Sequence, residues 1–237
     1  MVDYKNVIQG SWQGMEKFDG RNLRDKVYDV IRLEILEGRL AWGQRIDVRN
    51  IADNLRVSTQ PIRDAIMRLA QEGLITVQER HGTFVTPITS RYLTEVNQVR
   101  EMFETFGVSC APLLTSDLEQ LALRLEEMDQ VTRTEHCDYM VYNEHDFIFH
   151  QTLVELSHND TMITLYRRLH PHYLYSMILY RYPAAVEQFL LRDHQDHGQI
   201  VKYLQRNNRQ QAQGVISHHI KRSTEKILAI MEQPPSS

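Results

Sequence analysis

The sequence predicts a mostly α-helical protein, in which an N-terminal winged helix-turn-helix with a small β-hairpin wing precedes a C-terminal, all-α bundle of six helices. Three observations support this fold class. Two short amphipathic helices lie close together in residues 49–73, and two β-rich runs around a Gly-containing turn follow them directly. Beyond Ser90 the apolar residues keep a helical period without strand-like alternation.

The second of the two short helices is predicted to begin after Ser58, a residue type that caps helix N-termini, and to end at Gly73. Its apolar residues recur at spacings of three and four and form one buried stripe, made of Ile62, Ala65, Ile66 and Leu69. Thr59, Gln60 and Arg63 must then face outward. Such a polar first turn suits contact with base edges and phosphates in a DNA major groove. The alternative is an ordinary helical hairpin with a solvated polar face.

The β-rich runs at residues 74–78 and 83–86 flank a turn and predict a hairpin. A helix-turn-helix followed by a hairpin is the element order of a winged helix. Arg80 and His81 would lie at the tip of this wing, and Gly82 would permit close approach of the backbone. These residues are therefore candidates for contact with phosphates or the minor groove.

The run VSTQPIRDAIMRLAQEGLITVQERHGTFV, preceded by a helix ending at Gly38, resembles the DNA-binding domain of the GntR family of bacterial transcription regulators. The resemblance implies that Arg49, Arg63 and Gly82 contact DNA. Thr59 departs from the family pattern, which usually has Arg at that position. This departure removes one charged contact per subunit and leaves the fold expectation unchanged.

The chain of 237 residues is long enough for one small and one medium domain. We expect a mobile arm, a winged helix-turn-helix, a linker, an all-helical domain and a tail, over residues 1–20, 21–86, 87–90, 91–233 and 234–237 respectively. The helices of the bundle are expected at about residues 91–111, 116–133, 138–157, 160–180, 184–206 and 208–232.

Charge and composition bound the function classes. The net charge is −4, but residues 21–90 hold 11 arginines and lysines against 9 acidic residues. A mild basic excess therefore lies in the segment that contains the reader helix, the predicted DNA-contacting helix between Ser58 and Gly73. No apolar run approaches the roughly 20 residues of a membrane span, and no secretory signal is present, so we expect a cytoplasmic protein without membrane contact. Cys110 and Cys137 lack metal-ligand spacing and are expected to be buried small residues.

Four polar residues of the bundle fall on faces that the helical period assigns to the interior. Asp146 and His150 are four residues apart on the third predicted helix, so their side chains share a face. His197 lies on the inner stripe of the fifth helix and His219 on that of the last. Burying these groups together is unfavourable unless something joins them, and a divalent metal would do so. Zn is the first expectation, and Ni, Fe or Mn would also suit this ligand set.

Each histidine taken alone is instead expected to be a hydrogen-bonded core residue or a surface residue. The bundle, however, is similar to the FCD domain, the helical effector domain of one GntR subfamily, and the resemblance covers about residues 22–232. It implies a metal held by Asp and His through the pair Asp146-Phe-Ile-Phe-His150, with His197 and His219 at family-like positions. His194 and His218 are the alternative ligands nearby.

Arg100 also lies on an apolar stripe, that of the first bundle helix. A buried guanidinium requires a carboxylate or phosphate partner. One interpretation is a salt bridge to Glu104 or Asp146. The resemblance implies another, in which Arg100 and the metal together bind a small organic-acid effector.

The predicted function is that of a homodimeric transcription regulator, because one reader helix covers only a half-site of a double-stranded DNA operator. Two alternatives come from other classes. The protein could be a DNA-binding scaffold whose polar cluster holds water, or a metal enzyme, since two histidines and one carboxylate also describe a non-haem iron centre. No general base or nucleophile beside the ligands is evident, so we do not expect an enzyme.

Overall fold

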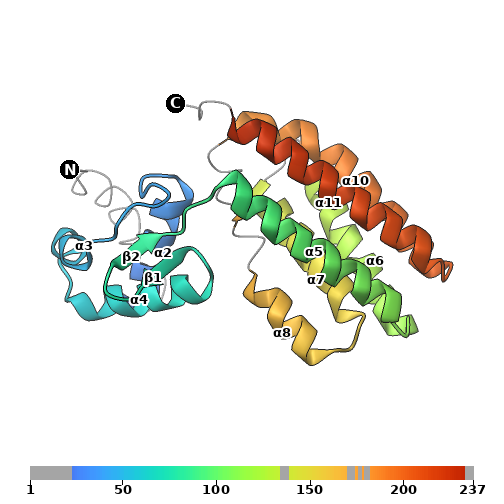
Figure 1. Cartoon of the computed structure of the whole chain (residues 1–237), viewed down its shortest axis with the longest axis horizontal. Coiled ribbons are helices and arrows are strands. Elements are labelled where there is room, and N and C mark those ends of the chain that lie inside the picture. Colours follow the sequence, from blue (N-terminus) through green and yellow to red (C-terminus); the bar gives the residue numbers. More distant parts are fainter. Residues whose placement is uncertain (1–22, 134–138, 170–173, 176–177, 179–181, 233–237) are drawn as a thin grey trace. The chain divides into compact units, whose positions relative to one another are not determined.

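The computed structural model describes residues 23–133, 139–169, 174–175, 178 and 182–232. They form two compact units that divide between Ile88 and Thr89 (Figure 1). The arm expected over residues 1–20 and the tail expected over residues 234–237 lie outside the described residues, as does Cys137.

The first unit has the element order of a winged helix, as the sequence predicts. Its elements are α2 (Leu23–Leu36), α3 (Val48–Leu55), α4 (Thr59–Gln71), β1 (Ile75–Gln78) and β2 (Gly82–Val85). The strands are antiparallel, with Ile75 opposite Val85 and Gln78 opposite Gly82. The core of the unit is built from fully buried aliphatic side chains of all three helices, including Ile31, Ile51, Ile62 and Leu69.

Local interactions set the ends of the two short helices. Asp47 caps α3, because its side-chain oxygen accepts hydrogen bonds from the backbone N–H groups of Arg49 and Asn50 at 3.0 and 3.1 Å. Helix α4 begins after Ser58 as predicted, although the Ser58 side chain makes no capping hydrogen bond. Gly73 has φ +78°, the left-handed conformation that lets the chain leave the helix and enter β1.

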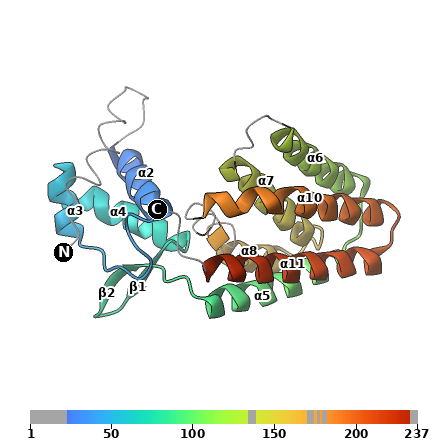
Figure 2. The same cartoon turned by 90° about the horizontal axis from the view of Figure 1, so that it is seen from above.

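Within the described residues of the second unit, all the regular secondary structure is α-helical. Its helices are α5 (Ser90–Cys110), α6 (Thr115–Thr132), α7 (Tyr139–Glu155), α8 (Asp160–Arg168), α10 (Pro183–Gln205) and α11 (Arg209–Met231). Helix α5 packs along α11 and along α7, and α10 lies against α11 and α6 (Figure 2). Five of these helices contribute to one buried cluster, which includes Val108, Leu121, Phe149, Leu153, Ile200 and Ile216.

Gly107 sets the distance between α5 and α7. A Cβ atom at this position would lie 2.6 Å from the backbone oxygen of Leu153 and 3.0 Å from the Cα of Val154. Only a glycine permits such close backbone approach. The contact fixes α5 against the helix that carries Asp146 and His150.

Two expectations from the sequence are wrong. The helix expected over residues 160–180 ends at Arg168, where the N–H of Leu169 turns back to the carbonyl oxygen of Tyr166 at 3.0 Å. That expectation rested on the spacing of apolar residues alone and took no account of Pro171. A proline disfavours a helical conformation in the residue before it. Cys110 is exposed rather than buried, because it is the last residue of α5 and its thiol lies near the carbonyl oxygen of Phe106.

None of the described helices combines the length and the apolarity that a membrane span requires.

Candidate functional site

The outward face of α4 carries the residues predicted to read DNA. Gln60 and Arg63 are exposed and Thr59 is half-buried, while the apolar residues of the same helix face the core. The Gln60 amide nitrogen donates a hydrogen bond to Asp64 one turn later, at 2.8 Å. Arg49 is exposed in the first turn of α3. The side chains are therefore available to a ligand outside the unit.

The wing presents further exposed polar residues. Arg80 and His81 are exposed in the turn between β1 and β2, and Arg80 adopts φ +64°. Gly82 has φ +121°, and a Cβ atom there would lie 3.0 Å from the Nε of Arg45. Arg45 is not predictable from the sequence, because its place beside the wing comes from an isolated bridge to Phe84 that no local pattern signals.

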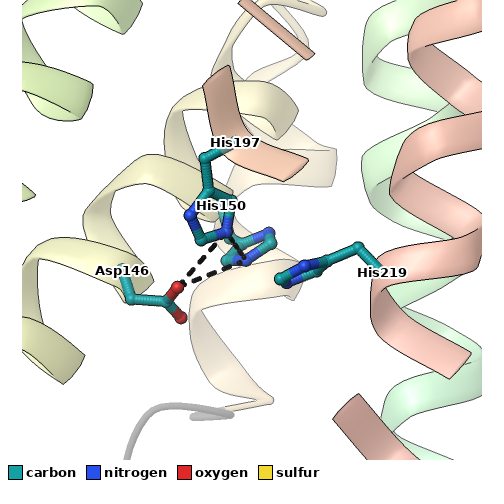
Figure 3. A group of neighbouring side chains, drawn as sticks. All are labelled: Asp146, His150, His197 and His219. Carbon is teal, nitrogen blue, oxygen red and sulfur yellow. Dashed lines mark hydrogen bonds and ion pairs between the residues drawn. The ribbon is translucent and has the colours of Figure 1, made fainter. Parts of the chain in front are cut away.

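Asp146, His150, His197 and His219 converge in the second unit. Their potential ligand atoms all lie within 4.8 Å of one another (Figure 3). Asp146 and His150 project from α7, one turn apart, while His197 comes from α10 and His219 from α11. The three imidazoles are buried, and Asp146 retains 24% of its side-chain exposure.

Distances within this cluster fit a shared cation. The Nε2 atoms of His150 and His197 are 3.3 Å apart, and they lie 3.7 and 3.4 Å from the Oδ1 of Asp146. Ligand atoms held at about 2.0–2.2 Å from one ion with tetrahedral angles are separated by roughly 3.3–3.6 Å. Burial lowers the pKa of His197 well below its usual range, and the neighbouring His219 and His150 lower it further. This imidazole is therefore kept in the neutral form that binds metals.

A buried carboxylate lies behind His150. The Oε2 of Glu104, on α5, is 2.7 Å from the Nδ1 of His150. The other carboxylate oxygen accepts hydrogen bonds from the Nε of Arg100 at 3.0 Å and from the hydroxyl of Tyr166 at 2.8 Å. Burial alone would raise the pKa of Glu104, but its interactions with His150 and Arg100 and the hydrogen bond from Tyr166 outweigh it and lower the pKa to about 2.

Arg100 is buried, as its place on the apolar stripe predicts. Of the two salt-bridge partners weighed from the sequence, it is Glu104 whose carboxylate accepts the hydrogen bond. The guanidinium also lies over the ring of Tyr175, 5.3 Å from its centroid. Binding of an effector by Arg100 remains a prediction.

A second carboxylate lies behind His219. The Oδ2 of Asp196 is 3.4 Å from the Nδ1 of His219, and it accepts a hydrogen bond from Arg222. Burial alone would raise the pKa of Asp196, but its interactions with His219 and Arg222 outweigh it and lower the pKa. Neither Asp196 nor Arg222 is predicted from the sequence to lie at the site.

Comparison with known proteins gives the family of this chain. Residues 23–85 match the model of the "Bacterial regulatory proteins, gntR family", and residues 95–222, more than half of the chain, match the model of the FCD domain. The chain belongs to the GntR family. It is a transcription regulator with a C-terminal FCD effector domain, and regulators of this family bind DNA and small-molecule effectors.

Relatives of this GntR regulator align with it over most of their length. It is 25% identical over 211 residues to the uncharacterized HTH-type transcriptional regulator YdhC of Bacillus subtilis, covering 87% of this chain and 91% of YdhC. It is 26% identical over 172 residues to the regulator McbR of Escherichia coli, covering 70% and 77% of the two chains. These relatives are regulators rather than enzymes.

Solved structures show the same fold. A putative GntR transcriptional regulator from Rhodococcus sp. RHA1 superposes with a TM-score of 0.67 at 22% identity, over 87% of this chain and 97% of that one. The structure of E. coli McbR/YncC gives a TM-score of 0.66 at 18% identity, over 90% of this chain and all of that one.

The other histidines of this GntR regulator that the structure describes have different surroundings. His194, weighed as an alternative ligand, contacts Asp129 instead, and His218 is exposed. His158 contacts Asp117 at 3.1 Å, and His145 lies 3.5 Å from Glu127. None of these four belongs to the group of converging ligand atoms, which is the set of four expected from the sequence.

Proposed function

We propose that this GntR regulator binds a short inverted-repeat operator as a homodimer, and that its FCD domain senses a small organic acid at a metal centre. The proposed metal ligands are Asp146, His150, His197 and His219. The observation that carries the proposal is the convergence of four potential ligand atoms from three helices in an otherwise well-packed bundle.

The operator is read by the first turn of α4. Gln60 and Arg63 contact base edges and phosphates in the major groove, and Arg80 and His81 reach the flanking backbone or minor groove from the wing. Their exposure supports these roles. Thr59 contributes no charge, so the charged contact of this turn rests on Arg63 alone. A second copy of the chain supplies the second half-site contact.

The ligand set suits Zn first, and Ni, Fe or Mn as alternatives, because it combines three imidazole nitrogens with one carboxylate oxygen. A divalent ion that takes more than these four ligands would offer its further coordination positions to the oxygens of an organic acid. Arg100 adds a positive charge beside the site. Only its Nε is needed for Glu104, and a guanidinium has five N–H donors, so Arg100 is able to pair with the acid as well.

Regulation requires that the acid prefer one arrangement of the two reader helices over the other. Coupling free energies in such systems are typically about 1–3 kcal/mol, or roughly 5–150-fold in affinity. We therefore expect the physiological acid to change operator affinity by a factor in this range.

The test begins with unbiased selection of genomic DNA fragments that the full-length protein binds. Operator affinity is then measured by fluorescence anisotropy with and without a panel of organic acids. At least one acid should change the affinity of the wild type, and Asp146→Ala should abolish the response while retaining operator binding. A response that persists in Asp146→Ala would remove the metal centre from the proposal, and selection of no DNA would remove the operator.

A matched pair of variants tests whether the first turn of α4 contacts the operator. Arg63→Ala should weaken operator binding, because it removes a charge from the reader turn. Arg206→Ala removes the same charge from an exposed position at the end of α10 and should bind as the wild type does. Equal affinities for the two variants would contradict the assignment of α4.

A further inference from the structure

Two of the three clustered imidazoles have a carboxylate on the side away from the cluster. Glu104 contacts the Nδ1 of His150, and Asp196 contacts the Nδ1 of His219. Each carboxylate also has an arginine partner, Arg100 in the first case and Arg222 in the second. The arrangement of arginine, carboxylate and histidine therefore occurs twice, on different helices.

We infer that Glu104 and Asp196 are positioning residues, which fix His150 and His219 in the tautomer that turns the Nε2 lone pair toward the metal. The inference rests on the proposed metal site. Neither carboxylate is a proposed ligand, and each acts through the histidine that it contacts.

A neutral imidazole carries its proton on either nitrogen, and only the unprotonated nitrogen can bind a metal. An ionised carboxylate accepts hydrogen bonds and donates none, so Glu104 requires the proton of His150 to be on Nδ1. The Nε2 of the same ring faces Asp146 and His197. The contact with Glu104 therefore selects the tautomer and also fixes the orientation of the ring.

The two oxygens of Glu104 have separate tasks. One accepts from Arg100 and Tyr166, which anchors the carboxylate in a fully buried position, and the other is left for His150. The guanidinium also compensates for placing a negative charge inside the bundle. Arg100 thus supports the site through Glu104, in addition to its proposed role toward the effector.

Because the two oxygens have different partners, Glu104→Gln tests whether Glu104 selects the tautomer of His150. The amide oxygen of the new side chain must face Arg100 and Tyr166, because both are donors. Its NH2 group then faces His150, so Nδ1 becomes the acceptor and the proton moves to Nε2, toward the metal. The nearly isosteric variant should select the wrong tautomer.

Asp196 should be the weaker positioning residue. Its oxygen is 3.4 Å from the Nδ1 of His219, longer than the 2.7 Å between Glu104 and His150. Hydrogen bonds between nitrogen and oxygen weaken beyond about 3.2 Å. At this distance the Asp196 contact is an ion pair and not a hydrogen bond, and within the described residues neither the Nδ1 of His219 nor that of His197 has a hydrogen-bond partner.

The experiment measures the dissociation constant of Zn by competition with a chelator, in the full-length wild type, Glu104→Gln and Asp196→Asn. We expect Glu104→Gln to weaken Zn binding by about 10–100-fold, as substitutions behind metal-bound histidines typically do. Asp196→Asn should cause a smaller loss, of less than about tenfold. Circular dichroism and thermal unfolding establish that each variant is folded.

Glu101→Gln is the matched control. Glu101 lies three residues before Glu104 on α5, carries the same charge and pairs with Lys221 rather than with a histidine. Zn affinity in this variant should equal that of the wild type. An equal loss in Glu101→Gln and Glu104→Gln would assign the effect to net charge and overturn the positioning role.

Nitrogen NMR of histidine-labelled, Zn-loaded wild type tests the inference without a variant. His150 and His219 should bind Zn through Nε2 and carry a proton on Nδ1, and binding through Nδ1 would overturn the inference even if Glu104→Gln does not fold. Unchanged Zn affinity in a folded Glu104→Gln would also overturn it. A wild type that binds no Zn or other divalent metal would instead refute the proposed metal site itself, so the two failures are distinguishable.

Discussion

Replacement of Gly107 by alanine should separate α5 from α7 and so disturb the candidate metal site without touching it. The added Cβ would lie 2.6 Å from the carbonyl oxygen of Leu153, and Cβ atoms essentially never approach closer than 3.0 Å. Both obstructing groups are backbone, so no side chain can move aside. The two helices must move apart by about 0.4 Å or more, a strain of the kind that overpacking introduces into cores.

The cost of this strain follows from typical values. Overpacking costs about 1–3 kcal/mol, and the higher helix propensity of alanine returns about 1 kcal/mol. Gly107→Ala should therefore be less stable than the wild type by up to about 2 kcal/mol. Because Glu104 precedes Gly107 by one turn of α5, the contact of 2.7 Å between Glu104 and His150 should also lengthen.

Gly214→Ala is the matched control for this prediction. A Cβ atom at Gly214, in the exposed face of α11, meets nothing within 4 Å. This variant should be as stable as the wild type or more stable by up to about 1 kcal/mol. The assay is urea unfolding of the metal-free proteins followed by circular dichroism. If Gly107→Ala is as stable as Gly214→Ala, the close approach of α5 and α7 does not exist as described.

Three further predictions concern single side chains. Arg63→Ala should reduce the slope of operator affinity against salt concentration by roughly 0.9 if the guanidinium contacts a phosphate, and an unchanged slope in an anisotropy titration would speak against that contact. Gly82→Ala should lower the free energy of unfolding by about 1–3 kcal/mol, because φ +121° is strained for alanine, and unchanged urea unfolding would contradict this. Tyr166→Phe should cost about 1–3 kcal/mol in the same assay, because it removes a donor from buried Glu104; a neutral effect would mean that the hydroxyl does not satisfy the carboxylate.

The sequence predicts the position of a site residue wherever that position depends on the period of a single helix. Asp146 and His150 share a face because they are four residues apart on α7, and His197 and His219 lie on the buried stripes of their own helices. Each placement needs only the helical period. The convergence of the four groups then follows, because the stripes of a bundle meet in one core.

Features that depend on the register between helices were not predictable in this way. Asp196 precedes His197 on α10 but contacts His219 on α11, and no spacing within either helix signals that pair. The spacing within α5 predicts Glu104 only as a partner for Arg100, although Glu104 also contacts His150 on another helix. The place of Arg45 beside Gly82 has the same origin, in a bridge between distant segments.

Metal content is the most direct test of the central claim, that the inward-facing cluster of this GntR regulator is a metal site. Zn, Ni, Fe and Mn are quantified by mass spectrometry in full-length wild type, His219→Ala and His218→Ala, each purified without metal-affinity steps or chelators. His218 is the exposed neighbour of buried His219, so the two variants lose the same chemical group from an exposed and a buried position of α11. We predict about one divalent ion per chain in the wild type and in His218→Ala, and a clear loss in His219→Ala. Equal metal content in all three proteins, or none in the wild type, would contradict the account.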